Sequence, residues 1–267
     1  EDDIQSEDSS EKEDEKEDKK TIYDAFYELW RNFIISNTNE PGSTYKPFTV
    51  AAGLESGVLT GNESYFCTGS LMVGKRNIGC SHVHGNITLK NALAKSCNVA
   101  MMNIAFNEGA DTFYKYQNIF GFGRSTGIDL PGEAETKSLV YNASNYSNSV
   151  TLATNSFGQN FNCTMMQMAA GISSLINGGN YYRPHIVKQI QSDSGNVIKN
   201  VEKEVLRKTV SEDTSATIRS YMQETVESGT GTKAQIEGYT IGGKTGTAEK
   251  IPRNKKDYYI SFIGFTP

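Results

Sequence analysis

The chain has 267 residues, of which 37% are hydrophobic and 21% are charged, so it can bury the core of one large domain. Its formal net charge is −5, but residues 1–20 hold eleven acidic and four basic side chains, and the remaining residues have a net charge of +2. The basic residues follow no pattern with aromatic residues that is typical of nucleic-acid binding, so we expect no nucleic-acid partner.

The acidic run 1–20 is poor in apolar residues, which predicts a disordered loop; cation binding is the less favoured alternative. Residues 21–267 are treated as one domain that begins with a helix. This helix is predicted from a capping Thr21 to Ile35, because its apolar residues share one side. They are Ile22, Phe26, Leu29, Trp30 and Phe33.

The next feature is an S-x-x-K string formed by Ser43 and Lys46. Pro41 and Gly42 end any preceding helix, so Ser43 is expected at or near the start of a new one. At a spacing of three residues, Lys46 lies on the same helix face as Ser43. Serine needs an adjacent base to act as a nucleophile. Lys46 is a base only when neutral, so its pKa must fall from about 10.4 to near 7, and burial together with a second nearby cation, for which Lys244 is the candidate, could provide this shift.

Ser96, Cys97 and Asn98 form an S-x-N string that interrupts a helical pattern. Side chains in such a connection can point into a cleft, although the string alone is also typical of an ordinary turn. The third string, K-T-G-T at residues 244–247, lies in a glycine-rich strand. Glycine in a strand often marks the close approach of another backbone, and a peptide substrate that pairs with the strand would fit.

The remaining predicted elements follow from helical spacing, caps and turn residues. No internal repeat is visible. The elements are a helix over 164–177 closed by glycines 178–179, a hairpin with strands 186–190 and 197–201, a helix from Ser211 to Gly229, and a last hairpin that pairs 239–247 with 258–265.

The three strings occur in the order S-x-x-K, S-x-N, K-T-G, which is the set found in penicillin-binding proteins and serine β-lactamases. Each string alone is common, but their order and flanking sequence are not. Residues 28–267 resemble the transpeptidase domain of class B penicillin-binding proteins, which are monofunctional D,D-transpeptidases. The segments that carry the resemblance are 40–49, 79–104, 120–133, 157–159, 229–231 and 243–247.

The resemblance implies an α/β (α+β) fold of the penicillin-binding protein and serine β-lactamase type, with an antiparallel sheet between helical layers and a mainly helical subdomain. It also implies a serine acyl-transferase that cross-links peptidoglycan stem peptides ending in D-Ala-D-Ala and is inhibited by β-lactams. No metal or cofactor is expected. The implied roles are Ser43 as nucleophile, Lys46 as base, Ser96 and Lys244 as proton relay, Asn98 as holder of the substrate amide and of the lysine, Thr245, Gly246 and Thr247 as substrate-binding residues, and the backbone N–H groups of Ser43 and Thr247 as oxyanion hole.

The resemblance further implies a parent protein anchored by one N-terminal transmembrane helix, with this domain outside the cytoplasm. No segment of this chain is apolar enough to span a membrane, and no signal peptide is visible. A membrane glycosyltransferase and the division, elongation or sporulation machinery are the expected partners. In the family a strand precedes the acidic loop and a strand and a helix follow residue 265, so we expect an internal fragment with an incomplete sheet.

The state of Cys67 and Cys80 is open from the sequence. Two free thiols are favoured, and a Cys67–Cys80 disulfide would suit an extracytoplasmic domain. A zinc site with His82 and His84 is the least favoured alternative, because the cysteine spacing is longer than in zinc knuckles. Both histidines are expected to be solvated loop residues.

Two other functions share these strings. A β-lactam sensor or β-lactamase-type hydrolase would keep all three, whereas a catalytically silent cell-wall scaffold would be expected to lose one, and none is lost. A hydrolase also needs a base that activates water, such as a glutamate in a Glu-x-x-Leu-Asn string, which this sequence lacks. The nearby Glu55 and Glu63 are expected to be solvated.

Overall fold

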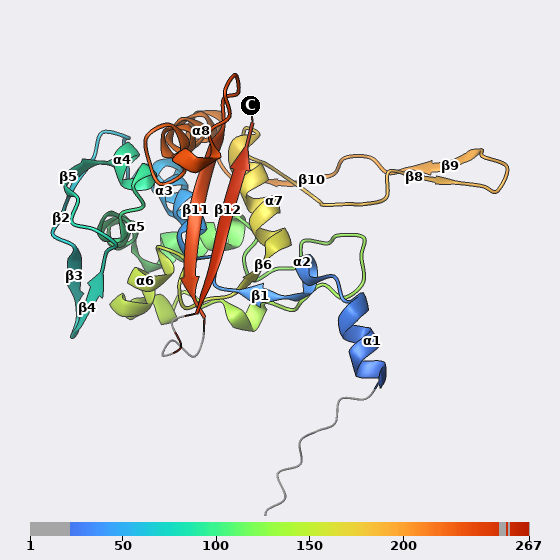
Figure 1. Ribbon diagram of the computed structural model, residues 1–267, viewed down its shortest axis with the longest axis horizontal. Coiled ribbons are helices and arrows are strands. Elements are labelled where there is room, and N and C mark those ends of the chain that lie inside the picture. Colours follow the sequence, from blue (N-terminus) through green and yellow to red (C-terminus); the bar gives the residue numbers. More distant parts are fainter. Residues whose placement is uncertain (1–21, 251–254, 256, 267) are drawn as a thin grey trace, which may run out of the picture. The chain divides into compact units, whose positions relative to one another are not determined.

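The structure, a computed structural model, describes residues 22–250, 255 and 257–266 (Figure 1). The acidic run 1–20 and the predicted cap Thr21 therefore lie outside the described residues. The chain divides into two compact units, one up to Arg31 and one from Asn32 onward.

The described part of the first unit is helix α1 (Ile22–Trp30), in which the rings of Phe26 and Trp30 stack at 5.4 Å. The prediction of one continuous helix to Ile35 was wrong. A second, short helix, α2 (Phe33–Ser36), follows in the other unit, and the Asn32 side chain accepts a hydrogen bond from the Ile34 N–H. Asn32 thus acts as an N-cap, which starts a new helix where apolar spacing alone suggested continuation.

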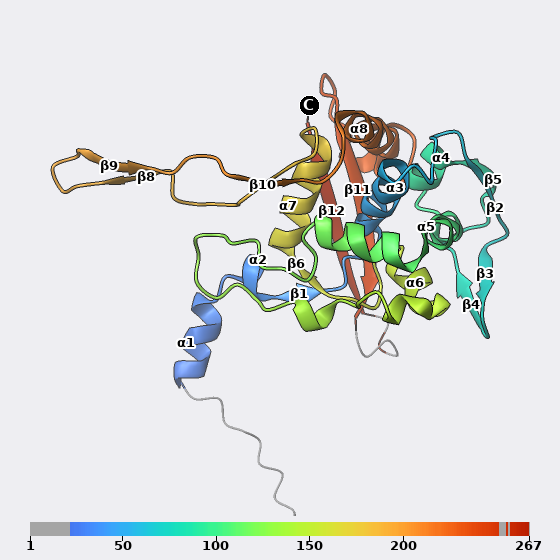
Figure 2. The ribbon, with the colours of Figure 1, turned by 180° about the vertical axis from the view of Figure 1, so that it is seen from behind.

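A long antiparallel hairpin of β11 (Gly242–Glu249) and β12 (Tyr258–Phe265) forms the centre of the second unit. Seen from behind, helices cover one face of this hairpin (Figure 2). Helix α8 packs against β11 and against α3 and α7, and α3 in turn packs against α5, which ties the layer to the strand. The helices are α3 (Lys46–Glu55), α5 (Asn98–Ile119), α7 (Met165–Ile176) and α8 (Glu212–Glu227).

The predicted ends of the later elements agree closely with the structure. Helix α7 begins with a capping box between Thr164 and Gln167, and α8 begins at its N-cap Ser211. The predicted hairpins are present, but each first strand starts later than expected. The remaining helices are α4 (Leu89–Ala94) and α6 (Ser149–Asn155), and the remaining strand pairs are β1 (Thr38–Asn39) with β6 (Cys163–Thr164), β2 (Ser64–Cys67) with β5 (Gly85–Thr88), β3 (Ser70–Val73) with β4 (Arg76–Gly79), β7 (Asn180–Tyr182) with β10 (Val205–Lys208), and β8 (Gln189–Gln191) with β9 (Val197–Asn200).

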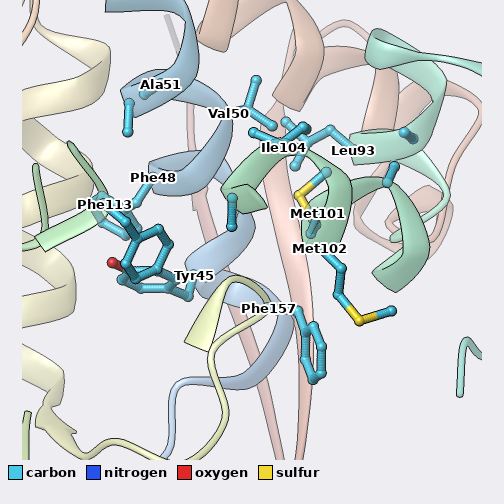
Figure 3. Close-up of a cluster of buried hydrophobic side chains, with 14 of the residues drawn as sticks. Tyr45, Phe48, Val50, Ala51, Leu93, Met101, Met102, Ile104, Phe113 and Phe157 are labelled. Atoms are coloured by element: carbon cyan, nitrogen blue, oxygen red, sulfur yellow. The ribbon is translucent and has the colours of Figure 1, made fainter. Parts of the chain in front are cut away.

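The core gathers around α3, whose first residues lead directly from the Ser43 turn. Tyr45 and Phe48 turn inward, with ring centroids 5.3 Å apart, and Phe113 of α5 packs beside Tyr45 (Figure 3). The turn that carries Ser43 is thereby fixed to the most buried part of the unit. No helix in the described part of the chain has both the length and the apolar content needed to cross a lipid bilayer.

Candidate active site

Ser43 lies in a tight 3-10 turn (Gly42–Tyr45) that leads into α3. Gly42 has a φ of +57°, and its N–H donates a hydrogen bond to the Gly158 carbonyl at 2.8 Å. A Cβ atom on Gly42 would come within 2.8 Å of the Thr247 carbonyl oxygen of β11. Glycine therefore lets the Ser43 turn lie directly against β11, and the prediction that Ser43 stands at a helix start is accurate to within one turn.

Lys46, the first residue of α3, is fully buried. Its Nζ donates three hydrogen bonds, at 2.6 Å to the Ser96 carbonyl, at 2.8 Å to Ser96 Oγ and at 2.7 Å to Asn98 Oδ1. Among the described residues, no hydrogen bond joins Lys46 Nζ to Ser43 Oγ. The S-x-x-K lysine is thus held by the S-x-N string in this structure.

Ser96 lies in the connection between α4 and α5, as predicted, and Asn98 is the first residue of α5. Ser96 has a φ of +59°, which is unusual for a residue with a side chain. The Asn98 Nδ2 donates to the Gly79 carbonyl at 3.0 Å, which orients its Oδ1 toward Lys46. The side chains of Ser96 and Asn98 therefore both point toward Lys46 Nζ.

Lys244 of β11 is also fully buried, and its Nζ lies 3.1 Å from Ser96 Oγ and 3.0 Å from the Thr245 carbonyl. The Ser96 hydroxyl is consequently shared by two lysines. Thr245 Oγ1 lies 2.7 Å from Thr230 Oγ1, a contact that spacing along the chain did not predict. Its only signal in the sequence is the family-like segment 229–231.

Burial sets the protonation of both lysines. It lowers the pKa of Lys46 to about 7, against an opposing effect of Cys80 and Cys97. Burial also lowers the pKa of Lys244 well below its usual range, and the charge of Lys46 lowers it further. The sequence suggested that burial and the Lys244 cation together lower the pKa of Lys46, and in the structure burial is the cause.

A cleft of about 930 Å³ opens in front of these groups. Ser43, Ser96 and Asn98 line it, and residues 245–247 line it from the strand. The close approach predicted for the glycine-rich strand comes partly from the protein itself, since a Cβ on Gly246 would lie 2.8 Å from Thr44 Cγ2. The residues that sequence reasoning did not name as part of the site include Gly79, Ser81, Gly231, Lys233, Ala234, Ile260, Ser261 and Phe262.

Cys67 and Cys80 are free thiols, the state that the sequence favoured over a disulfide, and Cys97 and Cys163 are free as well. Cys80 Sγ lies 3.9 Å from Cys97 Sγ and 3.6 Å from His84 Nδ1. His84 lies in a loop, as expected, but it is half-buried and its ring contacts a thiol, so it is not fully solvated. His82 lines the cleft instead.

The two nearby glutamates are not free solvated groups either. Glu55 accepts hydrogen bonds from the Ser211 N–H and hydroxyl at 2.8 Å, and thereby joins α3 to the start of α8. Glu63 accepts from Thr60 and from the Gly61 N–H within its own loop. Neither glutamate lines the Ser43 cleft.

Comparisons with known proteins place the chain in a family. A family model described as penicillin binding protein transpeptidase domain matches residues 3–267. Stage V sporulation protein D of Bacillus subtilis is 35% identical over 244 residues, covering 89% of this chain and 37% of that protein. PbpB of Mycolicibacterium smegmatis is 32% identical, covering 87% of this chain and 38% of its own length. The chain thus spans less than half the length of these relatives.

Solved structures show the same fold. The D,D-transpeptidase domain of a peptidoglycan glycosyltransferase from Eggerthella lenta superposes with a TM-score of 0.81 at 25% identity, covering 89% of this chain and 59% of that one. Penicillin binding protein 3 of Mycobacterium tuberculosis, solved with aztreonam, gives 0.79 at 28% identity, covering 88% and 55%. Since one family model runs along nearly the whole chain, and its relatives and structural neighbours agree with the α/β fold described above, the chain belongs to the penicillin-binding protein transpeptidase family, in its class B branch.

Proposed function

We propose that the protein is a serine D,D-transpeptidase that cross-links peptidoglycan stem peptides and is acylated by β-lactams. The observation that carries the proposal is the shared hydroxyl of Ser96, 2.8 Å from Lys46 Nζ and 3.1 Å from Lys244 Nζ, in the cleft that Ser43 lines. Relatives named peptidoglycan D,D-transpeptidase support the substrate class.

The chemistry divides into two acyl transfers. Neutral Lys46 accepts the proton of Ser43 Oγ, which attacks the carbonyl carbon of the penultimate D-alanine. The peptide C–N bond then breaks, and a proton passes through Ser96 and Lys244 to the departing D-alanine amine. An amine of a neighbouring stem then attacks the acyl carbon, the bond between this carbon and Ser43 Oγ breaks, and the proton that the amine loses passes to Ser43 Oγ.

The other polar groups of the cleft position the substrate. Thr245 and Thr247 hold its terminal carboxylate, Gly246 leaves room beside them, and Asn98 holds its amide. The backbone N–H groups of Ser43 and Thr247 stabilise the oxyanion, and each such donor typically contributes about 2.7–4 kcal/mol. Lys46 is bound to Ser96 and Asn98 here, and catalytic hydrogen bonds often tighten only when substrate is present.

In the cell, this site would work outside the cytoplasm in a protein with a single membrane anchor outside the present chain. Its partners would be a membrane glycosyltransferase, which supplies glycan strands, and the division, elongation or sporulation machinery. These assignments follow from the family and extend to the whole protein.

Labelling with a fluorescent penicillin tests the proposal. The purified full-length protein should carry the label on the peptide that contains Ser43, located by mass spectrometry. Ser43→Ala should abolish labelling, whereas Ser81→Ala, a matched change of another serine in the cleft, should leave Ser43 labelled. Label on a different serine, or undiminished labelling of Ser43→Ala, would contradict the assignment.

A further inference from the structure

We propose that Cys67, Cys80, His84 and Cys97 bind a structural zinc ion directly behind the S-x-N turn. The three sulfur atoms and a ring nitrogen all lie within 4.8 Å of one another. Cys67 and Cys97 are buried, and Cys80 and His84 are half-buried. The four side chains come from three separate places, which are the end of β2, the connection between β4 and β5, and the start of α5.

The two ligand distances from Cys80 fit a tetrahedral zinc site. Zn–S bonds of about 2.3 Å and Zn–N bonds of about 2.0–2.1 Å place two sulfurs about 3.8 Å apart and a sulfur and nitrogen about 3.6 Å apart. In the structure Cys80 Sγ lies 3.9 Å from Cys97 Sγ and 3.6 Å from His84 Nδ1. A disulfide requires an S–S distance of about 2.05 Å, so the pair is arranged as two ligands and not as a bond.

The surroundings of the sulfurs suit thiolate ligands. The Asn98 N–H donates to Cys80 Sγ at 3.2 Å, and the Ala100 N–H donates to Cys97 Sγ at 3.5 Å. Such second-layer donors orient metal ligands and offset their charge. Cys67 now donates to the His82 carbonyl at 3.6 Å, and this proton is among the three that the thiols would release on binding zinc.

Three thiolates and one imidazole form a closed ligand set of the kind that structural zinc sites use. Soft thiolate ligands in tetrahedral geometry select zinc over magnesium or calcium. With four protein ligands, no position remains for a water or substrate. The ion would therefore act on structure and would not take part in bond making.

The consequence for the cleft lies in Cys97, which is the middle residue of the S-x-N string. Its neighbours Ser96 and Asn98 hold Lys46 Nζ, and Ser96 keeps a φ of +59°. Residues in such strained conformations persist only where the surroundings fix them. Zinc would fix Cys97 against β2 and the β4–β5 connection, and so position the relay; this consequence rests on the proposed transferase function, whereas the zinc site itself does not.

Metal analysis of the purified full-length protein tests the site. Protein prepared under reducing conditions and freed of loose metal should contain one zinc ion per chain by mass spectrometry of the elements. Cys67→Ser and His84→Ala should each lose at least tenfold of this zinc. Cys163→Ser, a buried cysteine outside the cluster, and His82→Ala, the neighbouring histidine, should keep it.

A measurement on the unchanged protein covers the case in which a variant does not fold. Alkylation read out by peptide mass spectrometry should spare Cys67, Cys80 and Cys97 until a chelator is added. Replacement with Co²⁺ should give the intense visible bands of tetrahedral thiolate coordination. Folded, reduced protein that binds no zinc, a different metal in its place, full zinc in His84→Ala, or a Cys80–Cys97 disulfide with no metal would each overturn the proposal.

The role of zinc in positioning the S-x-N turn is tested by the rate of penicillin acylation. Removal of zinc should slow penicillin acylation about 10–100-fold, the range found for changes around metal sites, and added zinc should restore it. Stoichiometric zinc in a protein that penicillin never acylates would leave the zinc site standing and refute the proposed transferase function. Stoichiometric zinc whose removal leaves acylation unchanged would refute the positioning role alone.

Discussion

At the scale of single residues, the protonation of Lys46 gives a prediction for the pH dependence of the site. Burial lowers the pKa of this lysine to about 7. A lysine is a base only in its neutral form, whose fraction rises as the pH passes upward through this pKa. We expect the rate of β-lactam acylation to rise about tenfold per pH unit below pH 6 and to level off above pH 8. Stopped-flow acylation across this range would measure the profile.

Substitutions of the two lysines test the same assignment. Lys46→Ala should slow acylation about 10²–10⁴-fold, the usual contribution of a general base. Lys46→Arg should be as slow, because arginine keeps its charge at every accessible pH. Lys244→Arg is the matched control and should lose less. Near wild-type acylation by Lys46→Arg would show that the base lies elsewhere.

Two substitutions of Ser96 distinguish the role of its hydroxyl from the role of its backbone conformation. Glycine adopts its φ of +59° without strain, whereas alanine does not. Ser96→Gly and Ser96→Ala should both lose the relay hydroxyl and acylate slowly. Ser96→Gly should unfold at higher temperature than Ser96→Ala, with a difference in unfolding free energy of about 1 kcal/mol. Equal stability of the two variants by calorimetry would contradict this account of the turn.

At the scale of elements, caps decided how well the sequence predicted the structure. The start of α7 at Thr164 and of α8 at Ser211 could be predicted, because the capping residue and its partner lie within three positions. The break before α2 could not, since apolar spacing continues across it and only the Asn32 side chain shows that a new helix starts. A helix start is therefore predictable from the sequence when a capping hydrogen bond between neighbouring residues produces it and both residues are typical of such a cap.

Where α3 packs on α5, the carboxylate of Glu108 is buried, and this burial predicts how stability depends on pH. Glu108 is 6% exposed, neither of its oxygens has a partner among the described residues, and burial raises its pKa well above the usual range. A raised carboxyl pKa costs stability above the unfolded-state pKa of about 4.3, and this cost disappears below that pH. Glu108→Gln should therefore raise the melting temperature at pH 7 and change it little at pH 4.

Glu55 serves as a control for the Glu108 measurement, because the pKa of its carboxyl is shifted in the opposite direction. Burial raises its pKa, but the hydrogen bonds from Ser211 outweigh this effect and the net shift is downward. A lowered carboxyl pKa stabilises the fold above the unfolded-state value, and the gain is lost as the pH falls. Glu55→Gln should thus lower the melting temperature at pH 7. A loss of stability in Glu108→Gln at neutral pH would contradict the burial argument.

At the scale of the whole molecule, the site joins residues that are far apart in sequence. Lys46 meets Ser96 across 50 positions, and Lys244 meets it across 148. Spacing and periodicity cannot predict such contacts, so the assembly of the three strings came from family resemblance. Resemblance also has limits: it gave no reason to expect a cysteine and histidine cluster, and the residue pattern offered a zinc site with His82 and His84 only as the least favoured alternative. The packing of β2, the β4–β5 connection and α5 instead gathers Cys97 with Cys67, Cys80 and His84.

On the proposed function, the placement of Glu55 and Glu63 predicts how long a β-lactam stays attached. Hydrolysis of the acyl-enzyme needs a base that activates water. Glu55 is bound to the start of α8 and Glu63 to its own loop, and neither lines the Ser43 cleft. The penicilloyl-enzyme should persist for many minutes, while an added acceptor amine should release a substrate-derived acyl group. In an acylation and chase experiment, drug turnover at about 1 per second or faster, an ordinary enzymatic rate, would instead identify a β-lactamase.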